Sequence, residues 1–212
     1  MGLTFYDILE YIGTFAFAVS GIRAASIKRF DWFGAYVVGF VTATGGGTIR
    51  DLLLGITPFW MSDISYLIWT GIAFMAVIFF DKHFFRVKYT FFLFDTIGLG
   101  LFVVVGFEKS LLFGFPYWVA IIMGTLTGAA GGVIRDLLTN EIPLIFKKEI
   151  YAIACITGGV VYMVCDSLMV ETLLTQILAF SSVIIARILA VRFNICLPVL
   201  KEPKDDGQLK LF

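Results

Sequence analysis

The sequence predicts an all-α integral membrane protein with seven transmembrane helices, arranged as two inverted three-helix repeats followed by a seventh helix. Three observations lead to this fold class. Hydrophobic residues make up 59% of the 212-residue chain and charged residues only 15%, with a mean hydropathy of +0.94. Seven apolar runs are each long enough to cross a bilayer. Two long segments also match each other at a constant offset of 85 residues.

The composition excludes the common soluble classes. A soluble domain carries roughly 45–50% apolar and about 25% charged residues, and a chain this short cannot hide such an apolar excess in its own core. The excess must face lipid, which argues against a soluble enzyme, a nucleic-acid binder and a disordered regulator. Sixteen basic and sixteen acidic residues give zero net charge, so nothing in the total suggests a polyanionic partner.

Each predicted helix follows from a run of about 20 apolar residues, which at about 1.5 Å per residue crosses a hydrocarbon core of about 30 Å. Backbone groups cannot stay unpaired in lipid, so such runs form helices rather than isolated strands. The runs are 4–22, 32–53, 62–80, 89–107, 117–138, 149–166 and 171–191. They form a membrane domain, 1–197, with repeat one over about 4–80, repeat two over about 89–166 and the seventh helix over 171–191. Residues 198–212 are predicted to form a polar cytoplasmic tail.

The basic residues predict the orientation of the chain in an inner (plasma) membrane. With seven spans, the loops after spans 1, 3 and 5 share one side with the C-terminus. That side holds Arg23, Lys28, Arg29, Lys82, Arg86, Lys88, Lys147, Lys148, Arg192, Lys201, Lys204 and Lys210. Beyond the helices, the only basic residue expected on the opposite side is Lys109. We therefore expect a cytoplasmic C-terminus and an N-terminus outside the cell.

An internal duplication relates spans 1–3 to spans 4–6. Thr44–Leu53 and Ala129–Leu138 share an Ile-Arg-Asp-Leu-Leu sequence, and the same offset gives 19 identities among the 68 pairs from Tyr6/Phe91 to Ala73/Gly158. Each copy holds three spans. Because three is odd, the second copy must cross the membrane in the opposite sense, which makes the halves inverted repeats. This architecture is typical of transporters and some channels, with sites near the midplane between the repeats.

Glycines at matching positions of spans 2 and 5 mark the candidate ion path. A glycine costs a helix about 1 kcal/mol relative to alanine, so the segments Gly45–Gly47 and Gly131–Gly132 are expected to break or kink their helices. Freed carbonyls would then coordinate cations. The hydroxyl groups of nearby threonines could add further ligands. The alternative role of the glycines is to allow close packing of neighbouring helices. The predicted path comprises Thr42, Thr44, Gly45, Gly46, Gly47, Thr127, Gly131 and Gly132.

Matched charged residues are candidates for a gate or vestibule. Charges inside a span cost about 2.5–3.5 kcal/mol each, so they pair or reach water. Arg50-Asp51 and Arg135-Asp136 follow the glycines in each copy, as a gate, as structural braces of the helix, or with the arginines extending to the headgroups. Because neighbours on a helix diverge by about 100°, Arg50 and Asp51 are not expected to pair with each other.

Two further groups of charges belong to the helices themselves. Glu10 and Asp95 match across the repeat and could ring a cation path, or lie in a vestibule or near the beginning of their helices. Arg187, one turn from the basic end of span 7, is expected to extend to the headgroups.

Enzyme chemistry finds little support in this sequence. The single histidine, His83, lies in a predicted loop among charged residues, and HExxH, GxSxG and Walker sequences are absent. We therefore expect no catalytic residue, no cofactor and no metal beyond a cation that passes through transiently, with bound lipid as a candidate companion.

The doubled GG-x-IRD segment and the run Gly13–Gly21 (GTFAFAVSG) resemble the trimeric intracellular cation channel (TRIC) family, most closely its prokaryotic branch. The resemblance covers about residues 5–195. It implies a homotrimer in which each protomer has its own pore, conducting monovalent cations, chiefly potassium. It also implies that kinked spans 2 and 5 line this pore at the glycines, although the second copy carries Ala130 where the first has Gly45.

Two functions remain open at this point. The first is a passive potassium channel with carbonyls and threonines along the path and acids at its mouths. The second is a secondary transporter of glycine or another small amino acid, because some bacterial members of the wider group are regarded as glycine transporters. In the transporter, a helix amino terminus would bind the substrate carboxylate and the two halves would alternate access.

Overall fold

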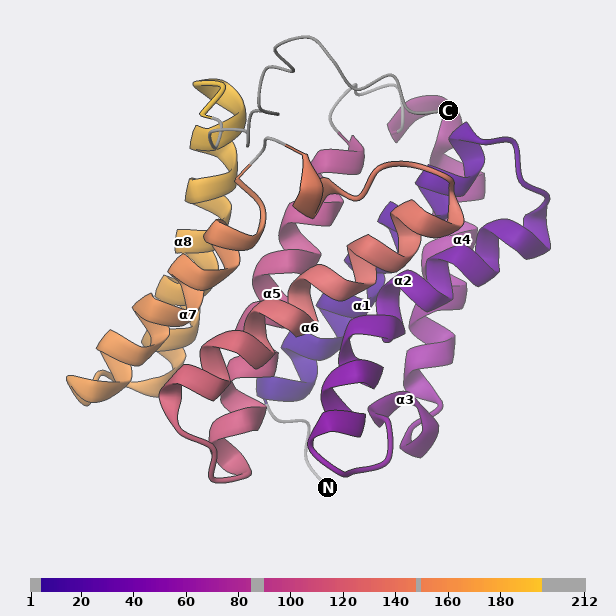
Figure 1. Cartoon of the computed structure of the whole chain (residues 1–212). Coiled ribbons are helices and arrows are strands. Elements are labelled where there is room, and N and C mark those ends of the chain that lie inside the picture. Colours follow the sequence, from indigo (N-terminus) through magenta and orange to yellow (C-terminus); the bar gives the residue numbers. More distant parts are fainter. Residues whose placement is uncertain (1–4, 85–89, 148–149, 196–212) are drawn as a thin grey trace, which may run out of the picture.

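The computed structural model describes residues 5–84, 90–147 and 150–195, and the regular structure in these ranges is entirely helical. The predicted tail, 198–212, lies outside the described residues, as do Arg86, Lys88 and Lys148. Seven longer helices each overlap one predicted run, which confirms the all-α class (Figure 1). They are α1 (Phe5–Ile27), α2 (Trp32–Leu53), α4 (Ser65–Phe84), α5 (Thr90–Leu112), α6 (Tyr117–Leu138), α7 (Ala152–Ser167) and α8 (Thr172–Arg192).

Two short helical segments were not predicted. They are α3 (Phe59–Ser62) and the 3₁₀ helix η1 (Leu144–Phe146), which begin directly after Pro58 and Pro143. These prolines are equivalent across the 85-residue offset, so the duplication extends to the connections. Four helices, α1, α5, α6 and α8, are long and apolar enough to cross a membrane. These helices fit the membrane class that the composition predicts.

The helices end where the backbone turns left-handed, and these points also repeat. Arg29 (φ 60°) and Gly114 (φ 80°) follow α1 and α5, while Gly55 (φ 73°) and Asn140 (φ 54°) follow α2 and α6. Glycine and asparagine adopt this region at little cost. As a result α1 continues to Ile27 and α5 to Leu112, each five residues beyond the predicted runs. The predicted runs end directly before the charged residues Arg23 and Glu108, whereas the helical hydrogen bonding continues past them.

Helices α1 and α5 build the centre of the molecule. The buried rings of Phe17 and Phe102, equivalent across the offset, stack with centroids 5.3 Å apart. Gly98 makes room for Phe17, because a Cβ there would collide with the ring, and a Cβ at Gly13 would lie 3.3 Å from the Phe102 ring. The duplicated sequence thus produces a reciprocal contact at the centre of the fold.

Equivalent helices of the two copies run in opposite directions in Figure 1. Helix α1 rises from the end marked N while α5 descends beside it, and α2 and α6 cross the molecule in opposite senses. Helices α7 and α8 pack together at one edge of the molecule, and α4 lies at the other edge against α1. The two copies therefore meet along α1, α2, α5 and α6.

Candidate functional site

The predicted glycines lie where α2 crosses α6. A Cβ at Gly46 would collide with the backbone carbonyl of Thr127, and a Cβ at Gly131 would collide with that of Thr42. The contact is reciprocal, because these four residues form two pairs across the 85-residue offset. Only glycine allows two helix backbones to approach so closely. The structure thus brings the two halves of the predicted path together at one point.

The predicted breaks at the glycines are wrong for this structure, because neither helix is interrupted there, whereas the predicted kink stays a prediction. Helices α2 and α6 continue as α-helix through Gly45–Gly47 and Gly131–Gly132 to Leu53 and Leu138. The physical reason is the packing at the crossing, which uses the missing side chains to gain interhelical contact and offsets the lower helix propensity of glycine. Close packing, the alternative role considered for these glycines, accounts for their positions.

The path threonines are hydrogen-bonded to their own helices. Thr42 donates to the Val38 carbonyl oxygen at 2.6 Å, and Thr127 donates to that of Met123 at 2.6 Å. Both side chains face glycines of the central helices, since a Cβ at Gly21 or Gly106 would lie 2.5 Å from the respective Oγ1. In the present conformation these hydroxyls therefore stabilise helix packing. Their role as ion ligands stays a prediction.

The remaining path residues lie around the crossing. Thr44 donates to the Phe40 carbonyl oxygen at 2.8 Å, and a Cβ at Gly45 would lie 2.8 Å from Cδ1 of Ile134 in α6. Gly47 packs under the ring of Phe59, whereas a Cβ at its counterpart, Gly132, would lie 2.7 Å from the Tyr151 hydroxyl.

The first charged cluster comprises Glu10, Arg50, Asp51 and Lys109. Arg50 Nη2 donates to Glu10 Oε1 at 3.3 Å, and Arg50 Nε donates to Asp51 Oδ1 at 2.8 Å. Lys109 Nζ, at the end of α5, lies 3.0 Å from the same Asp51 oxygen. The Glu10, Arg50 and Asp51 side chains are buried. Two acids and two bases balance in charge, as buried charges must.

The second charged cluster comprises Asp95, Arg135, Asp136 and Arg187. Arg135 Nη1 donates to Asp95 Oδ1 at 2.5 Å, and Arg135 Nε donates to Asp136 Oδ1 at 2.8 Å. Arg187 Nη2, from α8, lies 3.9 Å from Asp95 Oδ2. This cluster again holds two acids and two bases. Because both Arg-Asp pairs end helices that run in opposite directions, the two clusters lie on opposite sides of the crossing.

Two predictions about these charges are wrong. Arg50 does pair with Asp51, and Arg135 with Asp136, because the long guanidinium side chain folds back over its neighbour in the last helical turn. Arg187 does not extend to the headgroups: its side chain is 1% exposed and lies over the Tyr151 ring at 4.8 Å. The ion pair with Asp95 and the cation–π contact with the Tyr151 ring offset the cost of desolvating the Arg187 guanidinium.

The aspartates of the Arg-Asp pairs also hold the chain after each helix. Asp51 Oδ2 accepts from the Phe59 amide at 2.8 Å, and Asp136 Oδ2 accepts from the Leu144 amide at 3.0 Å. These amides begin α3 and η1, the short segments after the prolines. The pairs therefore brace the segments that follow α2 and α6, whereas the structural alternative considered for them was a brace of the helix itself.

The two clusters differ in how their acids are satisfied. Tyr66 donates to Glu10 Oε2 at 2.5 Å, and Tyr6 donates to Glu10 Oε1 at 3.2 Å. In the second half the shorter Asp95 replaces the glutamate, and the hydroxyl of Tyr151, the counterpart of Tyr66, has no hydrogen-bond partner within the described ranges. At equivalent positions, therefore, the tyrosine of the first half donates a hydrogen bond to the acid, whereas the tyrosine of the second half does not.

The sequence did not identify several members of these clusters. Ser20 accepts a 2.7 Å hydrogen bond from Arg135 Nη1 although it has no polar counterpart at position 105. Lys109 had been assigned only to a loop. Tyr66 and Tyr151 carried a usable signal, since they are an identical pair in the repeat. Among the residues that the structure describes, no group of three or more potential ligands could hold a metal ion.

Comparisons with known proteins place these features in context. A family model described as "Glycine transporter" matches the chain twice, at residues 7–82 and 92–167. The two matches begin 85 residues apart, the offset of the internal duplication.

Curated relatives and solved structures resemble nearly the whole chain. The UPF0126 inner membrane protein YadS of Escherichia coli K12 is 38% identical over 195 residues, covering 90% of this chain and 93% of the relative. A UPF0126 membrane protein of Vibrio cholerae is 38% identical over 193 residues, covering 90% and 81%.

Among solved structures, one described as "Structural basis for conductance through TRIC cation channels" matches with a TM-score of 0.83 and 38% identity, covering 94% of this chain and 99% of that one. A TRIC orthologue from Rhodobacter sphaeroides matches with a TM-score of 0.84 and 35% identity, covering 91% and 100%.

Proposed function

Since the chain belongs to the prokaryotic branch of the TRIC family, the group that the glycine transporter model also describes, we propose that it is a monovalent cation channel. Potassium is the principal ion, and each protomer of a homotrimer carries its own path. The protein lies in the inner membrane, as the name of its Escherichia coli relative states for that protein. Similarity in sequence and structure over nine-tenths of the chain supports this proposal.

The proposed architecture is a pair of inverted repeats with α8 added. An axis in the membrane plane would pass near the Phe17–Phe102 contact and exchange the two halves. The opposed directions of α1 and α5, and of α2 and α6, support this arrangement. The excess of lysine and arginine on one side then sets a cytoplasmic C-terminus and an external N-terminus.

The observation that carries the proposal is the α2–α6 crossing between two charge-balanced clusters. A cation would enter past one cluster, pass the crossing and leave past the other. In the present conformation the helices are in contact at Gly46 and Gly131, so the proposed path would be closed at this point. Opening requires α2 and α6 to separate. The Thr42 and Thr127 carbonyls would then face the gap, where the second lone pair of each could bind a dehydrated cation.

The charged clusters would act as the gate at each mouth. Each arginine already contacts two acids, so a small movement of α2 or α6 can exchange one partner for the other without leaving a charge unpaired. Such an exchange avoids the cost of a buried lone charge. The clusters can therefore brace the closed state and still permit opening.

A reversible cross-link tests this assignment. Gly45→Cys and Ile134→Cys would place two thiols side by side on α2 and α6, because a Cβ at Gly45 points at the Ile134 side chain. Oxidation should abolish potassium flux from liposomes, and reduction should restore it. Each single cysteine variant is the matched control and should conduct under both conditions. Undiminished flux through the cross-linked protein would remove the crossing from the ion path.

A secondary transporter of glycine or another small amino acid is the second candidate, favoured by the description of the family model. Each cluster holds arginine and acid side by side, which suits the carboxylate and ammonium groups of an amino acid. Saturable uptake of labelled glycine, sensitive to substitution of Arg135 or Asp95, would support this candidate. A transporter would also turn over far more slowly than a channel conducts.

A further inference from the structure

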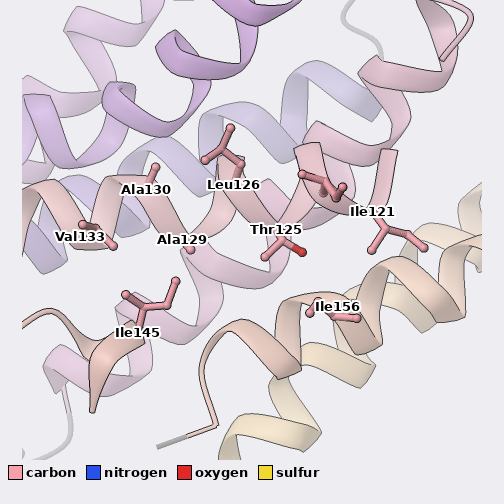
Figure 2. Close-up of a pocket in the computed structure, with 9 residues that line it drawn as sticks. Ile121, Thr125, Leu126, Ala129, Ala130, Val133, Ile145 and Ile156 are labelled. Carbon is pink, nitrogen blue, oxygen red and sulfur yellow. The ribbon is translucent and has the colours of Figure 1, made fainter. Parts of the chain in front are cut away.

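A cavity of about 430 Å³ lies on the side of α6 that faces away from the α2 crossing. Its walls come from α6, α7 and η1, and Figure 2 shows their side chains around it. Thr125 is the single polar residue of the lining, which comprises Ile121, Ile122, Thr125, Leu126, Ala129, Ala130, Val133, Ile145 and Ile156. The cavity opens to the outside of the molecule beside Ile122 and Ile156, which are 55% and 43% exposed.

The internal duplication shows which side chains occupy the equivalent space in the first repeat. The counterparts of Thr125 and Ile145 are Phe40 and Trp60, whose rings pack edge-to-face at 5.4 Å. Trp60 Nε1 also donates at 3.0 Å to Oγ1 of Thr48, the counterpart of Val133. In the first half the chain therefore fills this space with its own aromatic side chains, whereas in the second half the smaller residues leave it empty.

An empty apolar volume of this size is unfavourable, because protein interiors pack as densely as organic crystals. Water does not fill it, since apolar cavities stay dry. The occupant must come from the surroundings of the membrane-spanning part of α6, which are hydrocarbon. From Ile121 to Val133 the groove runs about 18 Å along the helix. That length is close to the roughly 15 Å hydrocarbon depth of one leaflet.

We propose that this cavity binds one acyl chain of a phospholipid whose anionic headgroup lies beside Lys147. The groove ends at Ile145, and Lys147 lies exposed two residues later at the end of η1. Lys147 belongs to the side of the molecule with the excess of basic residues, where an anionic headgroup is favoured. The acyl chain packs on the face of α6 opposite Gly131. It therefore stabilises the contact of α6 with α2 from behind.

Photo-cross-linking of the unaltered protein tests the occupant directly. The protein is reconstituted with phosphatidylglycerol that carries a diazirine in one acyl chain, and the adducts are mapped by mass spectrometry. Adducts are expected on the segment 121–133 and at Ile145 and Ile156. Adducts spread over all exposed helices, without enrichment at these positions, would overturn the proposal.

Filling the cavity with the counterpart residues of the first half provides the second arm. The double variant Thr125→Phe and Ile145→Trp should reduce the retained phosphatidylglycerol at least about tenfold, since each buried methylene contributes to binding. Val164→Trp, at a 46% exposed position of α7 outside the lining, is the matched control and should retain lipid. Lys147→Gln should abolish the preference for phosphatidylglycerol over phosphatidylcholine while an acyl chain is still retained.

The competing occupant is a second copy of this chain. Ile122→Cys would then form disulfide-linked dimers in liposomes, and the diazirine lipid would leave α6 unlabelled. That outcome would contradict the lipid assignment. Both experiments measure bound lipid rather than ion flux. The lipid proposal can therefore fail while the channel proposal holds.

Discussion

Replacing Gly46 by alanine should push α2 and α6 apart at their crossing. The added Cβ would collide with the Thr127 carbonyl, which is backbone and cannot rotate away as a flexible side chain does. Gly131→Ala should act in the same way through the Thr42 carbonyl. Both changes add a single methyl group, so any large effect arises from the contact itself.

The magnitude follows from a control glycine in the same protein. Gly71 lies inside α4, and a Cβ there would meet nothing within 4 Å. Gly71→Ala should therefore be neutral or stabilising by about 0.5–1 kcal/mol, the usual gain for a helix interior. Gly46→Ala has the same propensity gain but adds an overpacking cost of about 1–3 kcal/mol. The gain in helix propensity is the same in both variants, so the free energy of unfolding of Gly46→Ala should be about 1–3 kcal/mol lower than that of Gly71→Ala.

Unfolding in mixed detergent micelles, followed by tryptophan fluorescence, measures this difference. Gly46→Ala and Gly131→Ala should unfold at lower denaturant than the unaltered protein, and Gly71→Ala at the same or higher denaturant. Equal stability of Gly46→Ala and Gly71→Ala would refute the close contact at the crossing. The proposed closed path would then lose its structural basis.

Three further predictions concern the charged groups. Arg135→Met leaves buried acids uncompensated and should cost about 3–5 kcal/mol of unfolding free energy, whereas Lys28→Met breaks an exposed ion pair and should leave the unfolding midpoint unchanged. Tyr66→Phe removes a hydrogen bond to the buried Glu10 carboxylate and should cost about 1.5–3 kcal/mol; Tyr151→Phe should cost far less, and equal losses would contradict the asymmetry of the clusters. Hydrogen bonds from the Ser65 amide and the Tyr11 hydroxyl hold the pKa of Asp63 below its usual value, so its stabilisation is complete at neutral pH and is lost as the pH falls through that lowered pKa. The stability difference between Asp63→Asn and the unaltered protein should therefore shrink on acidification from pH 7, and a constant difference would refute it.

The sequence predicted the helices well because the signals are local or repeated. Apolar runs located all seven longer helices, and the duplication paired the residues that the structure places in equivalent contacts. Gly46 and Gly131 were both assigned to the ion path, and the structure places them at the same helix crossing, while their part in an ion path stays a prediction. Their effect was misjudged because helix propensity is local, whereas the approach of a second helix is a tertiary property.

The charged clusters could be predicted only in part. Glu10 and Asp95 were recognised as matched acids, but their arginine partners lie 40 residues along the chain and are brought close by packing. Arg187 was the hardest residue, because its distance from the helix end suggests an exposed side chain. Its burial depends on how α8, which has no counterpart in the repeat, packs against α5 and α7.

A planar-bilayer recording of the purified, reconstituted protein tests the central claim most directly. In symmetrical potassium chloride the proposed channel should give discrete unitary currents, and in a potassium gradient these should reverse near the potassium equilibrium potential. Oxidation of the Gly45→Cys, Ile134→Cys variant should remove the currents, and reduction should restore them. Saturable uptake of glycine by the same preparation, without unitary currents, would contradict the channel and establish the transporter in its place.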